Sequence, residues 1–210
     1  PSHTNLDYAQ IQDELEGHQT RRKLLLLQAL RWMLTRSKQT GRVQIISTFA
    51  TNDLLGLNSS DRLLTWFLPS GSNIPHLLQG SLARLVNAMA SGRSGREYLA
   101  QHRRLLETLI DCLVFIGGQM AAVTVDMIVA VLQKLSLKYS ARKMMLQRGL
   151  VSWLVTCHLV HLEPVRLYGL EYSTALLMNL CLHRSGKEQC VPLANSVLNL
   201  LLELLVRDLK

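Results

Sequence analysis

A short apolar pattern recurs three times along the chain at a nearly constant interval. It begins at Ala83, Ala130 and Ala175, which are 47 and 45 residues apart, and each copy keeps Ala first and Leu third over eight aligned residues. A period between 20 and 50 residues indicates a solenoid or a repeat array. One such unit cannot bury its apolar face alone, so the repeat constrains the chain to stack similar units against one another.

Each copy is followed by a polar break and a small basic stretch that begins near Ser94, Ser140 or Ser185, and a weaker copy begins at Leu27. The interval fits armadillo and HEAT units, which are helical and run roughly 40 to 47 residues. A leucine-rich composition with 5% aromatic residues also favours helices over strands. We therefore expect an all-α, armadillo/HEAT-like right-handed α-solenoid of about four repeats, without a sheet.

The pattern assigns residues 1–210 to a single solenoid. Its expected parts are a long N-terminal helix from about Asp7 to Thr35 with a first repeat (about 7–67), and further repeats at about 75–116, 124–161 and 168–210. Turn-forming residues predict a loop at 68–73. The last helix, from about Asn195 to Arg207, is apolar nearly all round. Because a terminal cap needs a polar outer face, we expect further repeats or another chain to cover it.

The sequence also indicates where individual helices begin and end. Shorter helices are expected at about 42–52, 60–67, 75–91, 94–101, 103–116, 124–138, 140–147, 150–161, 168–183, 186–191 and 193–206. Asn73 and Thr124 are suitable N-caps, and Pro75 fits a first helical turn. Three glycines lie where helices are expected to stop, namely Gly92, Gly149 and Gly186.

The repeat alignment identifies a candidate binding groove. In armadillo solenoids the third helix of each unit lines the concave inner groove. Equivalent positions there hold Asn87, Lys134 and Asn179, and positions one turn later on the same helical face hold Ser91, Lys138 and His183. We predict that these residues hold an extended or helical segment of another protein. The alternative is a solvated polar face without a partner.

The aligned positions four residues before the asparagines hold Ala83 and Ala175, where import receptors for basic peptides carry tryptophan. We therefore predict that the groove has no aromatic slots for lysine side chains. Its two rows of polar residues are neutral or basic. We do not expect a receptor of the importin type.

Six basic side chains form a second candidate surface, the basic rim: Arg93, Arg96, Arg103, Arg104, Arg142 and Lys143. With a formal net charge of +8, such a rim could bind acidic polymers directly, either the microtubule surface or nucleic acid. Aromatic residues do not alternate with these charges as they do in single-strand binders, so nucleic acid is the less expected partner. A solvated rim is the alternative.

No catalytic, cofactor-binding or metal-binding residues are predicted. The sequence contains no P-loop, nucleophile elbow, HExxH motif or kinase motif set, so we expect no enzyme, no cofactor and no small-molecule substrate. Cys157, His158, His161 and Glu163 lie close in sequence. Zinc needs three or four ligands of fitted geometry and no second cluster completes the set, so these histidines are expected to be packed or at the surface.

Cysteines, tryptophans and apolar runs complete the expectations. None of the four cysteines forms a CxxC pair, and we expect reduced, buried thiols at Cys112, Cys157, Cys181 and Cys190. The tryptophans lie on apolar helical faces and are expected in the core: Trp32, Trp66 and Trp153.

Gly117 and Gly118 interrupt the longest apolar stretch, Cys112–Leu132, so this stretch predicts two helices and a turn rather than a membrane span.

Four stretches carry a more specific resemblance: Leu24–Ser37, Ala83–Ala90 with Gly95–Ala100, Leu132–Leu137, and Leu170–Leu182 with Ser185–Lys187. Over about residues 20–205 the chain resembles the LisH-domain-containing armadillo-repeat family of ciliary proteins. The resemblance implies a non-enzymatic scaffold of the cytoplasm and cytoskeleton, at the basal body or centriole and at the ciliary tip. It implies a TOG-array microtubule regulator and other tip proteins as partners, and roles in ciliogenesis, axonemal microtubule stability and Hedgehog signalling. It assigns no site residues by motif.

Overall fold

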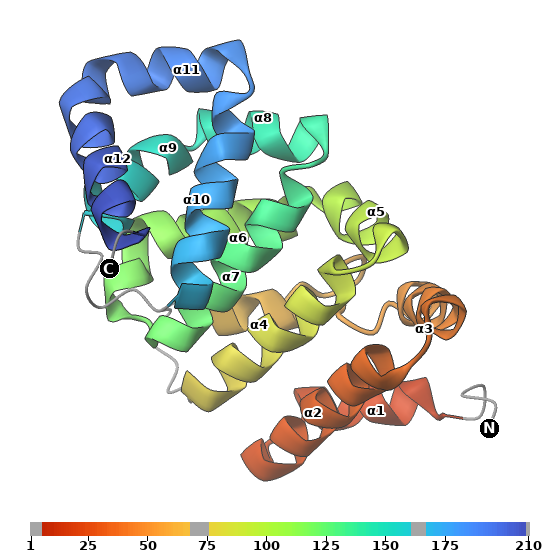
Figure 1. The fold of residues 1–210 in the computed structure, drawn as a ribbon. Helices are drawn as coiled ribbons and strands as arrows, with labels where there is room; N and C mark the ends of the chain where they lie inside the picture. Colours follow the sequence, from red (N-terminus) through yellow and green to blue (C-terminus); the bar gives the residue numbers. More distant parts are fainter. Residues whose placement is uncertain (1–5, 68–75, 161–166, 209–210) are drawn as a thin grey trace.

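The computed structural model describes residues 6–67, 76–160 and 167–208 (Figure 1). In these ranges the chain forms helices and no strand, which confirms the all-α prediction. The first half contains α1 (Tyr8–Glu16), α2 (Thr20–Arg36), α3 (Gln39–Thr51), η2 (Arg62–Phe67), α4 (His76–Ala90), α5 (Arg93–Gln101) and α6 (Arg103–Ile116). The second half contains η3 (Gly117–Gln119), α7 (Ala122–Leu135), α8 (Tyr139–Gln147), α9 (Leu150–Trp153), η4 (Leu154–His158), α10 (Leu167–Cys181), α11 (Arg184–Cys190), η5 (Val191–Leu193) and α12 (Ala194–Asp208).

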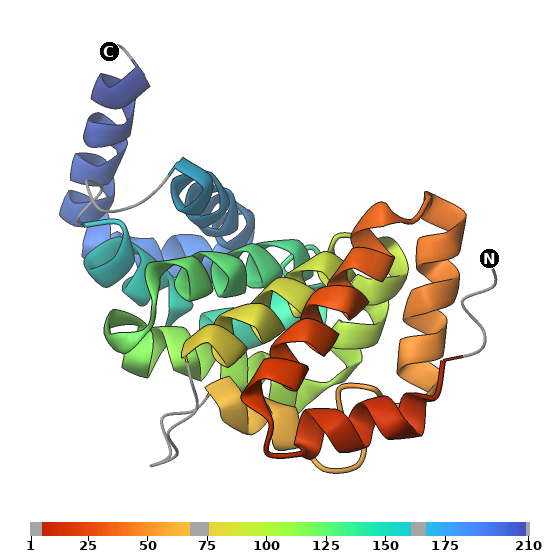
Figure 2. The ribbon, with the colours of Figure 1, turned by 90° about the horizontal axis from the view of Figure 1, so that it is seen from below.

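Four long helices form one layer of the molecule. Helix α2 packs against α4, α4 against α7, and α7 against α10, so that these segments from successive units lie side by side (Figures 1 and 2). The shorter helices α5, α6, α8, α9 and α11 join and support them from neighbouring positions. This stacked arrangement is the α-solenoid that the repeat predicts.

Apolar side chains between these helices make up most of the core. Side chains of α4, α7 and α10 that are at most 1% exposed include Leu85, Val86, Met89, Ile128, Leu132, Leu135, Leu176 and Leu180. Truncating one such leucine to alanine typically destabilises a protein by about 2–5 kcal/mol, because the cavity collapses only in part. Burial between units therefore fixes which side of each long helix remains available to solvent.

The prediction of one long N-terminal helix is wrong. Helix α1 ends at Glu16, the N–H of Gly17 donates to Asp13 O at 2.8 Å, and Gln19 takes an extended conformation before α2 begins. The break turns α1 so that it packs along α2. The Tyr8 ring then meets Phe49 edge-on at 6.2 Å, and Tyr8 becomes buried. A continuous helix would carry Tyr8 away from this contact, which explains why burial overrides helical propensity here.

Several predicted helix boundaries also need correction. Thr124 does not cap α7: the helix begins at Ala122, Ala121 is the N-cap, and Thr124 is buried inside the first turns. Gly186 does not end a helix but lies within α11. Gly149 does separate two helices, with a left-handed φ of 75° before α9. Gly92 precedes α5 as its N-cap. The predicted cap Asn73, Pro75 and the loop at 68–73 lie outside the described residues.

Two predictions about single side chains are partly wrong. Trp66 and Trp153 are buried as expected, but Trp32 is 40% exposed and carries the Arg36 guanidinium over its ring at 4.4 Å. This cation–π contact lets the indole stay at the surface. Cys112 is buried, whereas Cys157 is exposed and Cys181 and Cys190 are half-buried. An apolar helical segment in the sequence was therefore not enough to predict that its cysteine or tryptophan side chain is buried.

The longest apolar stretch divides as predicted, because α6 ends at Ile116 and α7 begins at Ala122. A different stretch satisfies the length and hydropathy of a membrane span. It runs from Arg184 to Val206 through α11, η5 and α12, and contains an 18-residue window with a mean hydropathy of 1.5, of which 6% is buried. The expectation of no membrane span did not consider this segment. Its exposed apolar side chains include Leu198, Leu202 and Leu205.

Two glycines allow neighbouring helices to cross closely at the ends of repeats. A Cβ atom on Gly95 of α5 would lie 1.8 Å from Met89 O at the end of α4, and one on Gly186 would lie 2.1 Å from Leu180 O near the end of α10. Both contacts involve backbone atoms, which cannot move aside as a flexible side chain can. These glycines lie at corresponding places after the first and third apolar copies, so close crossing is a repeated feature of the fold.

We predict that Gly95→Ala lowers the free energy of unfolding by about 2–4 kcal/mol, because overpacking against backbone displaces α5 from α4. Chemical denaturation of the purified chain measures the change. Gly118→Ala is the matched control, since a Cβ there meets nothing within 4 Å. Equal stability of the Gly95→Ala variant and the control would show that α5 does not cross α4 at this distance.

Candidate partner-binding surface

The layer of long helices brings together three of the six predicted groove residues. Lys134 Nζ on α7 lies 2.6 Å from Asn87 Oδ1 on α4 and 3.1 Å from Ser91 Oγ just beyond α4. Ser91 Oγ also donates to Asn87 O at 3.0 Å. Packing α4 beside α7 places these side chains within reach of one another, although 43 or more residues separate them in sequence.

Asn179 occupies a different environment from the one predicted. It is only 8% exposed, and its Nδ2 donates to Ser136 Oγ on the neighbouring unit at 2.9 Å. A buried amide needs such a partner, so Asn179 joins α10 to the end of α7 instead of facing a ligand. The repeat alignment placed Asn179 at the position equivalent to Asn87 and Lys134 but could not show that this position of α10 is covered.

The two remaining predicted groove residues lie at the margins of this surface. Lys138 Nζ is 3.5 Å from Glu97 Oε1 of α5, a weak, half-exposed ion pair. His183, between α10 and α11, has its ring 5.3 Å from that of Tyr139 at the start of α8. Among the described residues, the groups that hold Lys134 are instead Asn87, Ser91 and Tyr172.

Two tyrosines that the sequence analysis missed complete the site. Tyr168 OH accepts from Asn87 Nδ2 at 3.1 Å, and Lys134 Nζ lies 5.4 Å from the centre of the Tyr172 ring. The two rings are 4.5 Å apart on successive turns of α10. Their i, i+4 spacing was a signal that the sequence contained. We call Asn87, Ser91, Lys134, Tyr168 and Tyr172 the Lys134 cluster.

This cluster also revises the prediction that aromatic slots for lysine are absent. Alanines do occupy the positions that carry tryptophan in import receptors, but the tyrosines approach Lys134 from nearer the N-terminal end of α10. The lysine over the aromatic ring is the chain's own Lys134, so the slot is occupied internally. A receptor for basic peptides is still not expected.

The Lys134 ammonium is held by neutral groups. Its contacts in the described residues are the oxygens of Asn87 and Ser91 and the face of Tyr172. Burial, and to a smaller extent the nearby positive charge of Arg96, together lower the pKa of Lys134 from its usual 10.5 to about 8. Burying a cation costs free energy unless an anion compensates it. A carboxylate brought to this cluster by another protein would supply that compensation.

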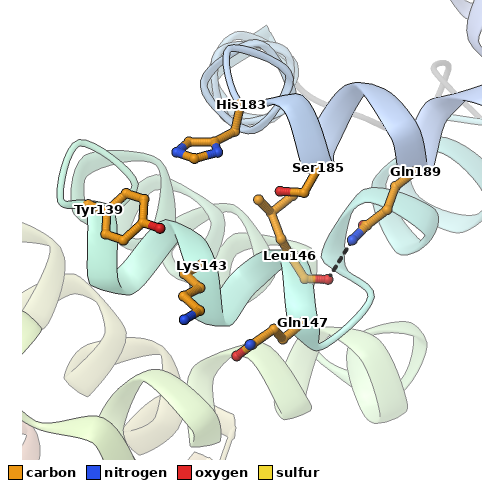
Figure 3. Close-up of a pocket in the computed structure, with 7 residues that line it drawn as sticks. All are labelled: Tyr139, Lys143, Leu146, Gln147, His183, Ser185 and Gln189. Carbon is orange, nitrogen blue, oxygen red and sulfur yellow. Dashed lines mark hydrogen bonds between the residues drawn. The ribbon is translucent and has the colours of Figure 1, made fainter.

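A pocket lies at the His183 end of the surface, between α8 and α11 (Figure 3). It has a volume of about 240 Å³. The rings of Tyr139 and His183 stand at one end, and Leu146 lies in the middle of the floor (Figure 3). Gln189 Nε2 donates to Leu146 O at 2.9 Å and so ties α11 to α8. The exposed Lys143 is the lysine among the lining residues, which makes the pocket more suited to an acidic than to a basic group.

The predicted basic rim divides into two kinds of residue. Three of its arginines are exposed and pair with carboxylates of this chain: Arg93 with Glu97, Arg103 with Glu107, and Arg104 with Asp61. Two others turn inward to cap the ends of long helices. Arg96 donates to Ala90 O and Ser91 O, and Arg142 donates to Ser136 O at 2.9 Å. Lys143 lines the pocket described above.

The short cluster weighed as a metal site lies only partly within the described residues. Among the described residues, no group of three or more His, Cys, Asp or Glu side chains could hold a metal ion. The His158 ring stacks on Trp153 at 4.6 Å and its Nε2 lies 2.8 Å from Ser173 Oγ. His158 is therefore a packed histidine, while His161 and Glu163 lie outside the described residues.

Comparison with known proteins gives one consistent result. A family model described as the armadillo repeats of LisH domain-containing protein ARMC9 matches residues 145–210. The LisH domain-containing protein ARMC9 of Danio rerio is 41% identical over 202 residues, covering 96% of this chain and 24% of that protein. Its Homo sapiens counterpart is 39% identical over 205 residues, with the same shares, 96% and 24%. The Mus musculus protein is 37% identical over 203 residues, again 96% of this chain and 24% of that protein.

The chain thus spans about a quarter of the length of the curated relatives it matches. No solved structure matches it significantly.

The lowered pKa of Lys134 predicts a specific pH dependence of stability. The folded value of about 8 lies below the ordinary 10.5, so between these pH values the unfolded chain binds the extra proton. Stability conferred at this site must therefore rise with pH across that window. We expect the stability of the wild type relative to Lys134→Met to increase by about 1 kcal/mol from pH 7 to 10.5, after allowance for solvent screening.

Denaturant titration of both proteins at each pH measures this difference, which removes contributions that the two chains share. Lys143→Met, at an exposed position of α8, controls for the loss of a lysine. A wild-type advantage that stays constant or declines with rising pH would contradict the proposed burial of the Lys134 charge.

Proposed function

Because the chain belongs to the family of the LisH domain-containing protein ARMC9, we propose that it is a non-enzymatic scaffold segment acting at the ciliary basal body and tip. Armadillo repeats in general mediate protein–protein interaction and carry no catalysis, and the chain is a repeat-based interaction segment of this kind. In the proposal, its contacts contribute to ciliogenesis, axonemal microtubule stability and Hedgehog signalling.

The observation that carries the proposed binding mode is the half-buried, uncompensated charge of Lys134. Its ammonium is fixed by Asn87 and Ser91 and flanked by the Tyr172 ring. These contacts hold the donor in one position before a partner arrives, which reduces the entropy lost on binding. A carboxylate placed here would gain a charge-assisted hydrogen bond.

The tyrosine pair suggests the form of the partner. Tyr168 and Tyr172 offer about two helical turns of half-buried aromatic surface beside the cation. Aromatic side chains beside a fixed charge are typical anchors of protein interfaces. We propose an extended or helical segment with an acidic residue at Lys134 and an apolar residue against the tyrosines. A TOG-array microtubule regulator, or another ciliary tip protein, is the proposed source of this segment.

Direct binding of acidic polymers is the second candidate, and the net charge of +8 is the observation in its favour. Two features of the rim weaken it. Arg93, Arg103 and Arg104 already pair with carboxylates, and Arg96 and Arg142 are committed to helix ends. A polyanion such as the microtubule surface would have to displace these contacts, so we favour the shaped cluster over the rim.

We predict that Lys134→Glu combined with Lys138→Glu weakens binding of the full-length protein to a purified TOG-array regulator by at least about tenfold, because charge-assisted contacts are typically worth 1.5–3 kcal/mol. Quantitative pull-down measures the loss, and circular dichroism checks that helicity is retained. Lys38→Glu combined with Lys187→Glu makes the same change in net charge at exposed positions outside the cluster, the rim and the pocket, and should bind like the wild type. If both doubly substituted proteins lose affinity equally, net charge rather than the cluster determines binding.

Salt dependence separates the two candidate functions. We expect association with the regulator to fall by less than about tenfold between 50 and 200 mM salt, since few ion pairs form at the cluster. Direct association with microtubules through the rim would fall by about a hundredfold or more over the same range. Co-sedimentation with purified microtubules, run alongside the pull-down, decides between them; a steep loss in the pull-down itself would favour the polyanion candidate.

A further inference from the structure

Two cysteine thiols meet where α10 and α11 end. Cys181 is the last residue of α10 and Cys190 the last residue of α11. Their Sγ atoms are 3.5 Å apart, and both side chains are half-buried and not disulfide-bonded. The sequence analysis predicted reduced, buried thiols because the cysteines form no CxxC pair, and it did not predict that these two would meet.

The backbone at this corner brings the sulfur atoms together. His183 takes an extended conformation as the N-cap of α11, and its carbonyl accepts from the N–H groups of Gly186 and Lys187, each at 3.1 Å. Gly186 then passes so close to Leu180 O that a Cβ would lie 2.1 Å from it. Because helix α11 is held against α10 by this crossing, the contact between Cys181 and Cys190 is part of the fold.

We propose that Cys181 and Cys190 form a dithiol site that a small disulfide, such as oxidised glutathione, converts into an intramolecular disulfide. A disulfide has an S–S length near 2.05 Å. The sulfur atoms must therefore approach by roughly 1.5 Å, which modest side-chain rotation can provide in a half-buried site.

The exchange proceeds in two balanced steps. The Cys190 thiol loses its proton, and its sulfur attacks one sulfur of oxidised glutathione, releasing one molecule of reduced glutathione. The Cys181 sulfur, after losing its own proton, attacks Sγ of Cys190 in this mixed disulfide and releases a second reduced glutathione. The two protein thiols are oxidised by two electrons, and the oxidant is reduced to two thiols.

The order of these steps follows from the surroundings of Cys181. Burial, and then its hydrogen bond with Cys190, raise the pKa of the Cys181 thiol to about 12, although the nearby Lys187 opposes the shift. With so high a pKa, only a small fraction of the thiol is present as thiolate. It attacks an external oxidant slowly, because the thiolate is the nucleophile. Once Cys190 carries the mixed disulfide, proximity offsets the small thiolate fraction of Cys181.

The disulfide would secure the C-terminal part of the fold. It links α10 to the residue that precedes η5 and α12, beside Gln189, whose side chain ties α11 to α8. Closing a loop of this size typically stabilises a domain enough to raise its melting temperature by about 5–10 °C. Oxidation would therefore hold α11, and with it the pocket wall in Figure 3, in place.

The test uses the full chain purified in reduced form and equilibrated with mixtures of reduced and oxidised glutathione. We expect two of the four thiols to be lost together, and trypsin to yield two peptides joined by a disulfide. Cleavage after Arg184 and Lys187 separates Cys181 from Cys190, so the two peptides stay together only through that bond. The melting temperature should rise with the oxidised fraction and return after reduction.

Three variants make the result specific. Cys181→Ser should stop at a stable glutathione adduct on Cys190, and Cys190→Ser should form no linked peptide. Cys157→Ser removes the exposed thiol and should leave the linked pair unchanged. The proposal is overturned if the wild type accumulates separate glutathione adducts at both positions, or if the linked peptide contains Cys157 in place of either residue.

Discussion

Side-by-side packing of α4, α7 and α10 is the constraint on which the rest of the structure depends. Each helix presents leucine and other aliphatic side chains to its neighbour, and residues such as Leu85, Leu132 and Leu180 are fully buried between them. Contacts with the two flanking helices cover most of the surface of a long helix. This packing therefore determines which of its polar residues stay near the solvent. Gly95 and Gly186 then allow the short helices α5 and α11 to cross close to the ends of α4 and α10.

The same packing explains how a basic side chain becomes half-buried without a carboxylate. Lys134 lies where α7 is flanked by α4 on one side and α10 on the other, so Asn87 and Tyr172 reach it from different repeats. The energy to hold its charge there comes from leucine burial elsewhere in the layer. Sites that retain an unfavourable charge in this way are candidates for recognition, because a partner of opposite charge gains more there than at a solvated residue. The rim arginines, which already have carboxylate or carbonyl partners, offer less.

The repeat period and apolar spacing were sufficient to predict the helical fold and most helix positions, and they placed Asn87 and Lys134 at equivalent positions of successive repeats. They could not predict features that depend on distant contacts. The break at Gly17 results from the burial of Tyr8 against Phe49. The covering of Asn179 depends on Ser136 of another repeat, and the meeting of Cys181 with Cys190 depends on the angle between two helices. Tyr168 and Tyr172 were visible as an i, i+4 pair, but only the packing of α10 on α7 shows that they face Lys134.

A double-mutant cycle between Asn87 and Lys134 tests most directly whether α4 and α7 pack in the register that creates the binding surface. The two positions are 47 residues apart in sequence, so their side chains interact only if the repeats align as described. Unfolding free energies of the wild type, Asn87→Ala, Lys134→Ala and the doubly substituted chain give the coupling energy. The account predicts a favourable coupling of about 1 kcal/mol. Additivity to within about 0.3 kcal/mol would contradict it.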